Sequence, residues 1–176
     1  MKTVNSLSGG KTSSYMAVHY PADYNIFSLV RTDDTKCMFP DAKVRQMVSD
    51  RIGTDFIGTL EQDTIIYTML DLEQFMGREI TWVTGRTFDE IIIRKDKKYL
   101  PNVMQRFCTV EMKLNPINDW WWNNVQEVVE MRLGFRANES KRATNMIKRC
   151  NEEGIMLQKF IVGKRSDGKN KWKEFP

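Results

Sequence analysis

The chain has 176 residues, of which 41% are hydrophobic and 28% are charged, as in an ordinary globular protein with one domain. No apolar run approaches the about 20 residues that a membrane helix needs, and residues 1–4 lead directly into a predicted strand. We therefore expect a cytoplasmic protein without a signal peptide. The net charge of +4 favours an anionic ligand and permits a nucleic-acid partner.

Strand-like and helix-like segments alternate along the chain. Short β-prone runs predict strands at residues 2–7, 25–30, 55–58, 80–84 and 125–133. Helical spacing predicts helices at residues 11–20, 41–52, 63–76, 87–95 and 140–151, and in the later part of 99–124. This alternation predicts the α/β class, with a doubly wound, mostly parallel sheet in a three-layer arrangement. Residues 164–176 form a polar, basic tail that is either loose or docked elsewhere.

Glycines and hydroxyl side chains follow the first predicted strand. The segment consists of Ser8, Gly9, Gly10, Lys11, Thr12 and Ser13. Glycines let backbone N–H groups approach an anion closely, and a helix N-terminus adds a partial positive charge. We expect a phosphate-binding loop here, at the carboxyl end of a strand, where open α/β sheets bind ligands. A Walker A loop would require glycine at position 5, where this chain has Asn5, and the alternative is an ordinary glycine-rich turn.

Two acidic residues follow the second predicted strand. Asp33 and Asp34 can bind ribose hydroxyls, or together bind a metal ion. A solvated acidic turn is the alternative.

A third segment contains Arg106, Cys108 and Lys113. Arg106 and Lys113 can contact phosphate or sulfate. Cys108 can be a nucleophile or a cluster ligand, or simply a small buried apolar residue. The chain has three widely spaced cysteines and one histidine, which argues against a zinc ribbon, a redox Cys pair and a Ser-His-Asp triad.

A fourth segment follows the last strong strand. Gly134 permits close backbone approach, and Arg136 and Arg142 flank Glu139, which can balance their charge. This pattern favours an anion-binding site. The alternative is a helix start with Ser140 as N-cap and charges that face solvent.

Three of these segments together resemble the phosphoadenosine phosphosulfate (PAPS) reductase-like branch of the PP-loop ATP pyrophosphatase superfamily, of which many members are encoded by phages or prophages. Residues 8–13 match its pattern Ser-Gly-Gly-x-[Asp/Thr]-Ser. Residues 106–113 read Arg-Phe-Cys-Thr-x-x-x-Lys, and residues 134–142 read Gly-Phe-Arg-Ala-Asn-Glu-Ser-x-Arg. The resemblance covers Lys2 to about Arg142.

The resemblance implies a five-stranded, Rossmann-like fold of the adenine-nucleotide α-hydrolase type over residues 1–163. It implies that residues 8–13 bind the phosphates of ATP or a sulfonucleotide, and that the strand end at Leu29 and Thr32 meets adenine and ribose. The remaining anion would be neutralised by Arg106, Lys113, Arg136 and Arg142, with Gly134 and Glu139 in the same site. The candidate catalytic residues are Lys11, Arg106 and Cys108.

The expected reaction is cleavage of the α–β anhydride of ATP, with adenylylation of a substrate and release of pyrophosphate, with Mg²⁺ as a possible cofactor. ATP-using members often carry Asp at the position of Thr12. A sulfonucleotide (PAPS or APS) reductase or sulfotransferase is the first alternative, although no Glu-Cys-Gly-type motif follows Cys150. The second is a non-catalytic subunit that binds nucleotide or nucleic acid through residues 120–122 and the basic tail. A homo-oligomer is compatible with each of these.

Overall fold

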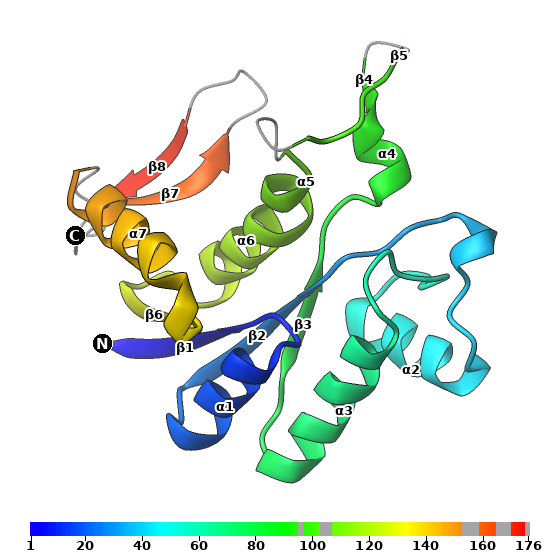
Figure 1. The fold of residues 1–176 in the computed structure, drawn as a ribbon, viewed down its shortest axis with the longest axis horizontal. Coiled ribbons are helices and arrows are strands. Elements are labelled where there is room, and N and C mark those ends of the chain that lie inside the picture. Colours follow the sequence, from blue (N-terminus) through cyan, green and yellow to red (C-terminus); the bar gives the residue numbers. More distant parts are fainter. Residues whose placement is uncertain (95–96, 103–106, 153–158, 165–169, 175–176) are drawn as a thin grey trace.

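The computed structural model describes residues 1–94, 97–102, 107–152, 159–164 and 170–174. Its centre is a four-stranded sheet in the order β3-β2-β1-β6, in which every neighbouring pair is parallel (Figure 1). The strands are β1 (Lys2–Leu7), β2 (Tyr24–Leu29), β3 (Thr81–Thr84) and β6 (Val129–Leu133). The α/β class with a parallel sheet is thus confirmed, but the sheet has four strands in the described residues rather than five.

Helices connect the strands. They are α1 (Lys11–His19), α2 (Ala42–Ile52), α3 (Thr64–Met76), α4 (Phe88–Ile92), α5 (Phe107–Thr109), α6 (Asn115–Asn124) and α7 (Ser140–Glu152). Short turns add η1 (Thr35–Cys37), the π-helical η2 (Val110–Leu114) and η3 (Ala137–Glu139). None of the described helices has the length and apolar character needed to cross a bilayer.

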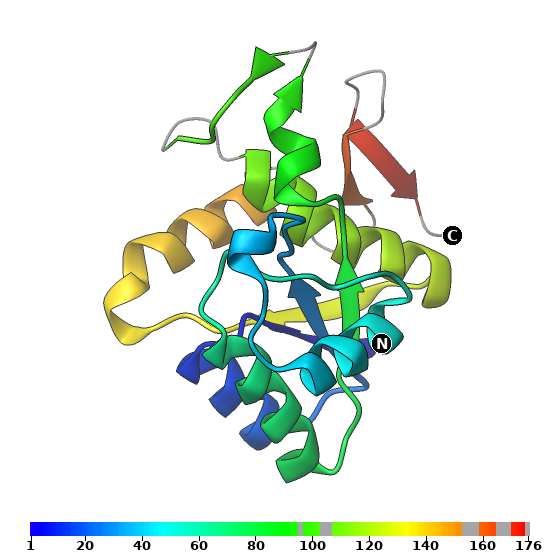
Figure 2. The same cartoon turned by 90° about the vertical axis from the view of Figure 1, so that its right-hand side faces the viewer.

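Two antiparallel hairpins stand outside the central sheet. β4 (Ile93–Arg94) pairs with β5 (Lys97–Lys98), and Figure 2 shows this hairpin and α4 projecting beyond the sheet. β7 (Lys159–Lys164) pairs with β8 (Asn170–Glu174), so the expected boundary between domain and tail at 163/164 falls inside β7.

The two faces of the sheet pack against different helices. Val4 and Ile26 pack with Ile117 of α6 on one face. Phe27 packs with Ile66 of α3 on the other face, in a cluster that also includes residues of α1 and α2. Figure 1 shows α6 on one side of the sheet and α1 and α3 on the other. Neighbouring residues of a strand point to opposite faces of the sheet. Because helices cover both faces, β2 is apolar on both of them.

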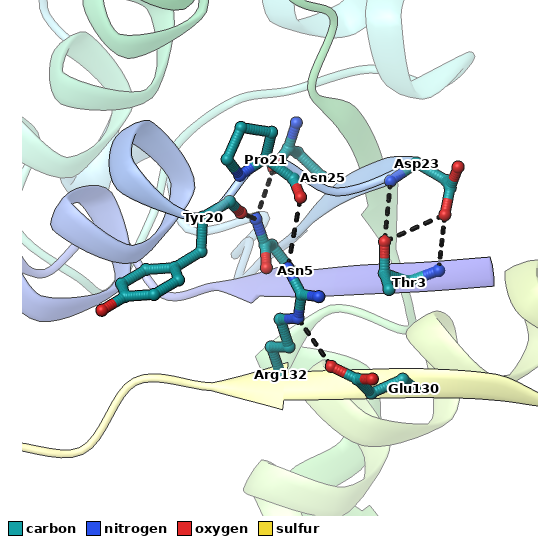
Figure 3. Close-up of polar contacts among 8 residues, drawn as sticks. All are labelled: Thr3, Asn5, Tyr20, Pro21, Asp23, Asn25, Glu130 and Arg132. Carbon is teal, nitrogen blue, oxygen red and sulfur yellow. Dashed lines mark hydrogen bonds and ion pairs between the residues drawn. The ribbon is translucent and has the colours of Figure 1, made fainter. Parts of the chain in front are cut away.

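A buried polar network fixes the chain after α1 (Figure 3). Asn5, fully buried in β1, donates through Nδ2 to the Tyr20 carbonyl at 2.9 Å and to Asn25 Oδ1 at 3.2 Å. Arg132 of β6 donates to the Pro21 carbonyl at 3.2 Å. The chain directly after α1 is therefore tied to three adjacent strands.

Two of the consecutive tryptophans pack against the protein. Trp121 is buried, and its Nε1 donates to the Glu127 carbonyl at 3.1 Å. Trp120 lies edge to face on Tyr24, with 5.3 Å between ring centroids. Trp121 is thus a core residue, whereas Trp120 is half-buried and packs against the core through Tyr24.

The prediction of a strand at residues 55–58 is wrong. Gly58 makes only isolated bridges, to Thr32 and to Met38. A Cβ at Gly58 would lie 1.8 Å from the Cys37 carbonyl oxygen, so this glycine allows two loops to cross.

We predict that Gly58→Ala lowers the free energy of unfolding by about 1–3 kcal/mol, because overpacking forces the Cys37 backbone to move. Gly10→Ala is the control, since its nearest atom would be 3.6 Å away and its φ of −89° is ordinary. Urea unfolding monitored by tryptophan fluorescence measures both. Equal midpoints for the two variants would contradict this assignment.

Candidate functional site

The candidate site lies at the switch point of the sheet, where the strand order reverses. The chain runs from β1 to β2 and β3 in one direction, and β6 then pairs with the opposite edge of β1. In parallel sheets, ligands bind outside the carboxyl ends of the strands at such a point. The segment 8–14, called here the glycine loop, follows β1, and residues 134–136 follow β6.

The two segments touch through their backbones. A Cβ at Gly134 would lie 3.1 Å from the Ser13 nitrogen and 3.2 Å from the Thr12 carbonyl carbon. Both distances are tighter than ordinary van der Waals contact. Gly134 therefore allows the start of α1 to approach the end of β6, as a site shared by both loops requires.

The glycine loop is shaped by its own serines. The buried Ser13 hydroxyl donates to the Gly10 carbonyl at 2.9 Å and accepts from the Ser8 backbone N–H at 3.2 Å. Ser8 Oγ lies 3.1 Å from Ser13 Oγ. The Ser13 hydroxyl thus holds the loop in shape, whereas the exposed Ser8 and the half-buried Thr12 are open to a ligand.

Gly9 serves two purposes in the same loop. Its φ is +73°, a conformation that favours glycine. A Cβ there would also lie 2.4 Å from Cγ2 of Ile65, in the first turn of α3. The glycine loop is therefore held between the start of α3 and the loop after β6.

The N-terminus of α1 is open. Gly10 occupies the N-cap position with extended φ and ψ angles, and no side chain caps the helix in the described part of the chain. First-turn N–H groups have no partner within a helix, so they attract an anion. Lys11 is exposed and takes part in none of the ion pairs found among the described residues.

The loop after β2 is held from inside by a carboxylate. Asp89 of α4 accepts from Thr32 Oγ1 at 2.7 Å and from the Asp33 N–H at 2.8 Å. These hydrogen bonds, that from Thr32 first, lower the pKa of Asp89 below its ordinary value. Leu29 is 1% exposed and packs in the core, so only its backbone can meet a ligand. Thr32 and Asp89 act as supports for this loop.

The two aspartates of this loop are open to solvent. Asp33 and Asp34 are exposed, and Asp34 accepts from the Lys36 N–H at 2.9 Å. No group of three or more potential metal ligands among His, Cys, Asp and Glu occurs in the described residues.

The third predicted segment is only partly described. Arg106 lies outside the described residues. Cys108 is half-buried and packs against the cluster of Val30, Ile91 and Met112. Lys113 forms an ion pair with Glu61, a residue that we did not predict from the sequence.

The segment after β6 begins α7. Glu139 accepts from the Arg136 N–H at 2.9 Å, and Arg136 is exposed. Ser140 has helical angles and follows η3, so it is the first residue of α7 rather than its N-cap. Arg142 lies in α7, but its side chain is outside the described part.

A separate groove of about 450 Å³ runs along the free edge of β3, where it is lined by Trp82, Arg86, Glu111, Asp119 and others. Its lining does not include the glycine loop. No protein-family model, curated protein or solved structure matches the chain. Among the described residues, the glycine loop and Gly134 meet where the segments after β1 and β6 touch, and none of the predicted phosphate-binding residues lines the groove.

We predict that Asp89→Asn destabilises the protein by about 1 kcal/mol at pH 7, after allowance for the partial exposure of the carboxylate. A carboxyl with a lowered folded pKa stabilises above its unfolded pKa of about 3.9 and loses this effect as the pH falls through the folded value. The difference between wild type and variant should therefore shrink in acid. Urea unfolding at pH 7 and pH 3 measures it.

Asp63→Asn is the matched control, because Asp63 is exposed and its side chain makes no cap hydrogen bond. A difference between wild type and Asp89→Asn that stays constant with pH would contradict the proposed role of the Asp89 charge.

Proposed function

We propose that this protein is an adenine-nucleotide-binding enzyme of the PP-loop type. It cleaves the α–β phosphoanhydride of ATP and transfers the adenylyl group to an acceptor, with release of pyrophosphate. The observation that supports this best is the open N-terminus of α1, placed by a Ser-Gly-Gly turn at the switch point and packed against Gly134. The proposal includes a three-layer, doubly wound arrangement of the adenine-nucleotide α-hydrolase type.

In this proposal the glycine loop holds the phosphates. The first-turn N–H groups of α1 donate to phosphate oxygens, and the Thr12 hydroxyl adds a donor. The Lys11 ammonium supplies a positive charge, and Arg136 on the facing loop supplies another. The loop after β2, held by Asp89, lies beside the glycine loop because β1 and β2 are adjacent, and it meets adenine and ribose.

The proposed chemistry is a displacement at the α-phosphorus. A nucleophile of the acceptor forms the new bond to phosphorus while the bond to the α–β bridging oxygen breaks. The electron pair of that bond leaves with pyrophosphate, and the proton of the nucleophile passes to solvent. Fixed N–H groups and the charge of Lys11 stabilise the leaving pyrophosphate, which is the principal source of rate in such sites.

A magnesium ion would come with the nucleotide. Mg²⁺ commonly binds through substrate phosphates and one or two carboxylates. Asp33 and Asp34, both exposed in the loop after β2, can supply the carboxylates.

We predict that Gly10→Asp abolishes ATP binding and pyrophosphate release without loss of stability. An aspartate at the N-cap of α1 would accept from the first-turn N–H groups, and it would raise the free energy of unfolding by about 0.5–1 kcal/mol. The same carboxylate would repel phosphate. Calorimetry with ATP and urea unfolding measure the two effects.

Two controls separate charge from space at this position. Gly10→Ala leaves the first-turn N–H groups open and should keep most of the affinity for ATP. Gly10→Asn offers these N–H groups an uncharged acceptor, so its affinity for ATP should lie between those of the other two variants. Unchanged ATP binding by Gly10→Asp would overturn the proposed site.

We further predict that Cys108→Ser retains ATP binding and pyrophosphate release, because Cys108 packs against apolar residues. Cys37→Ser, at a second free cysteine, is the control. Loss of turnover in Cys108→Ser with nucleotide binding retained would instead favour the thiol chemistry of a sulfonucleotide reductase.

A further inference from the structure

The groove beside β3 includes an open edge of the central sheet. In the described residues β3 pairs with β2 alone, and Trp82, Val83, Thr84 and Gly85 line the groove in succession. An edge strand presents backbone N–H and C=O groups that have no partner within the sheet. The groove, of about 450 Å³, also has the size of an ordinary ligand site.

Gly85 brings a π-helical turn against the end of β3. A Cβ at Gly85 would lie 2.6 Å from the Glu111 carbonyl oxygen in η2 and 2.9 Å from Cγ of Pro116 in α6. This close approach lets η2 and α6 complete the lining that β3 begins. Single π-helical turns are frequently found at functional sites.

The helical part of the lining carries carboxylates and amides in a regular order. Glu111, Asn115, Asp119 and Asn123 are each four residues apart and all line the groove. At a rise of 1.5 Å per residue, the two carboxylates are separated by about 12 Å along the helix axis. Residues four apart in an extended chain are separated by about 13 Å and point to the same face. The carboxylates therefore match two basic side chains of an extended peptide.

Two buried polar atoms of the lining have no partner. Nε1 of Trp82 and Oδ1 of Asn115 make no hydrogen bond within the part of the chain that the structure describes. The first is a donor and the second an acceptor, and leaving such groups buried and unpaired destabilises the free protein. A peptide group carries both an acceptor and a donor, so a bound peptide can satisfy the two atoms.

One basic residue also lines the groove. Arg86 is exposed, but its guanidinium donates to the Glu90 carbonyl of α4 at 2.9 Å. The carboxylate of Glu111 is half-buried and accepts only a long hydrogen bond from Asn115 Nδ2, at 3.4 Å, and Asp119 is exposed. The charge that this lining offers to a ligand is therefore mainly negative.

We propose that the groove binds an extended peptide of a partner protein, which adds a strand to β3 and carries two lysine or arginine residues four apart. Main-chain hydrogen bonds to β3 provide affinity, as in other cases of strand addition, and Glu111 and Asp119 select the basic side chains. The lining does not include the glycine loop, so the interaction is independent of the proposed nucleotide site.

The experiment begins with selection of random peptides, displayed on phage, against the immobilised full chain. Peptides of about seven residues suffice, since they span about 23 Å when extended. We expect enriched peptides to carry two basic residues four apart and no proline between them, because proline lacks the N–H that a paired strand needs. Tryptophan fluorescence then measures the Kd of an enriched peptide for the full chain and its variants.

We expect Glu111→Gln and Asp119→Asn each to raise this Kd about threefold, as for partly exposed ion pairs, and the double variant to raise it about tenfold. Asp63→Asn combined with Asp71→Asn is the matched control. Both residues are exposed and lie outside the lining of the groove, so this variant changes the net charge equally but should leave the Kd unchanged. Urea unfolding verifies that each variant is folded.

Methylation of alternate peptide nitrogens tests the pairing with β3. Successive N–H groups of a strand point to opposite edges, so one set would face β3 and the other would face away. One methylated peptide should therefore lose binding, and the other should bind within about twofold of the parent.

Three results would overturn the proposal: no enrichment, enrichment that the double variant of Glu111 and Asp119 reproduces, or an equal effect of the two methylated peptides. Sedimentation of the full chain tests a second copy as the occupant. If wild type is a dimer and the double variant is a monomer, the groove binds another copy of this chain and the partner peptide is excluded.

Discussion

The backbone contact between Gly134 and the start of α1 is the constraint on which the candidate site depends. It brings the end of β6 against the end of β1, where the strand order reverses. A side chain at position 134 would push the two segments apart by a few tenths of an ångström, because its Cβ would lie 3.1 Å from the Ser13 nitrogen. The buried Asn5 network acts at the other end of α1, so the helix is held at both ends.

The segments around this contact are supported by groups that need not touch a ligand. Ser13 shapes the glycine loop, Asp89 holds the loop after β2, and Thr59 positions Glu61. Each of these groups is already satisfied within the protein. The groups left open are the first-turn N–H groups of α1 and the Lys11 side chain, which together attract an anion. This division between supporting and open groups is what we expect of a preorganised phosphate site.

Much of the fold follows from local patterns. The β-prone runs at residues 25–30 and 80–84 and the helical spacing at residues 41–52 and 63–76 predict their elements, because burial and periodicity depend on nearby residues. The structure places Gly53 and Gly77, both with left-handed angles, at the ends of these two helices. The prediction at residues 55–58 is wrong because their β-prone composition does not indicate that Gly58 must lie against the Cys37 carbonyl. The resemblance implies five strands, whereas the sheet has four in the described residues. Sequence motifs that bind a ligand lie at one end of the strands and give little information about the far edge of the sheet.

The candidate site is predicted less completely than the fold. The glycine loop and Gly134 could be found from their glycines, but Asp89 and Glu61 could not. Their partners, Thr32 and Lys113, are distant in sequence, and an isolated acidic residue carries no signal of its own. For the same reason the sequence suggests that Lys113 is available to a ligand, whereas the fold supplies it with a carboxylate. Ser13, a predicted ligand donor, turns its hydroxyl inward because the loop needs it.

Backbone amide chemical shifts during ATP titration of the ¹⁵N-labelled protein would test the central claim most directly. The account predicts that the largest changes fall on Gly10, Lys11 and Thr12, with smaller changes at Gly134 on the facing loop. Changes confined to residues that line the groove beside β3, or no changes at all, would contradict it.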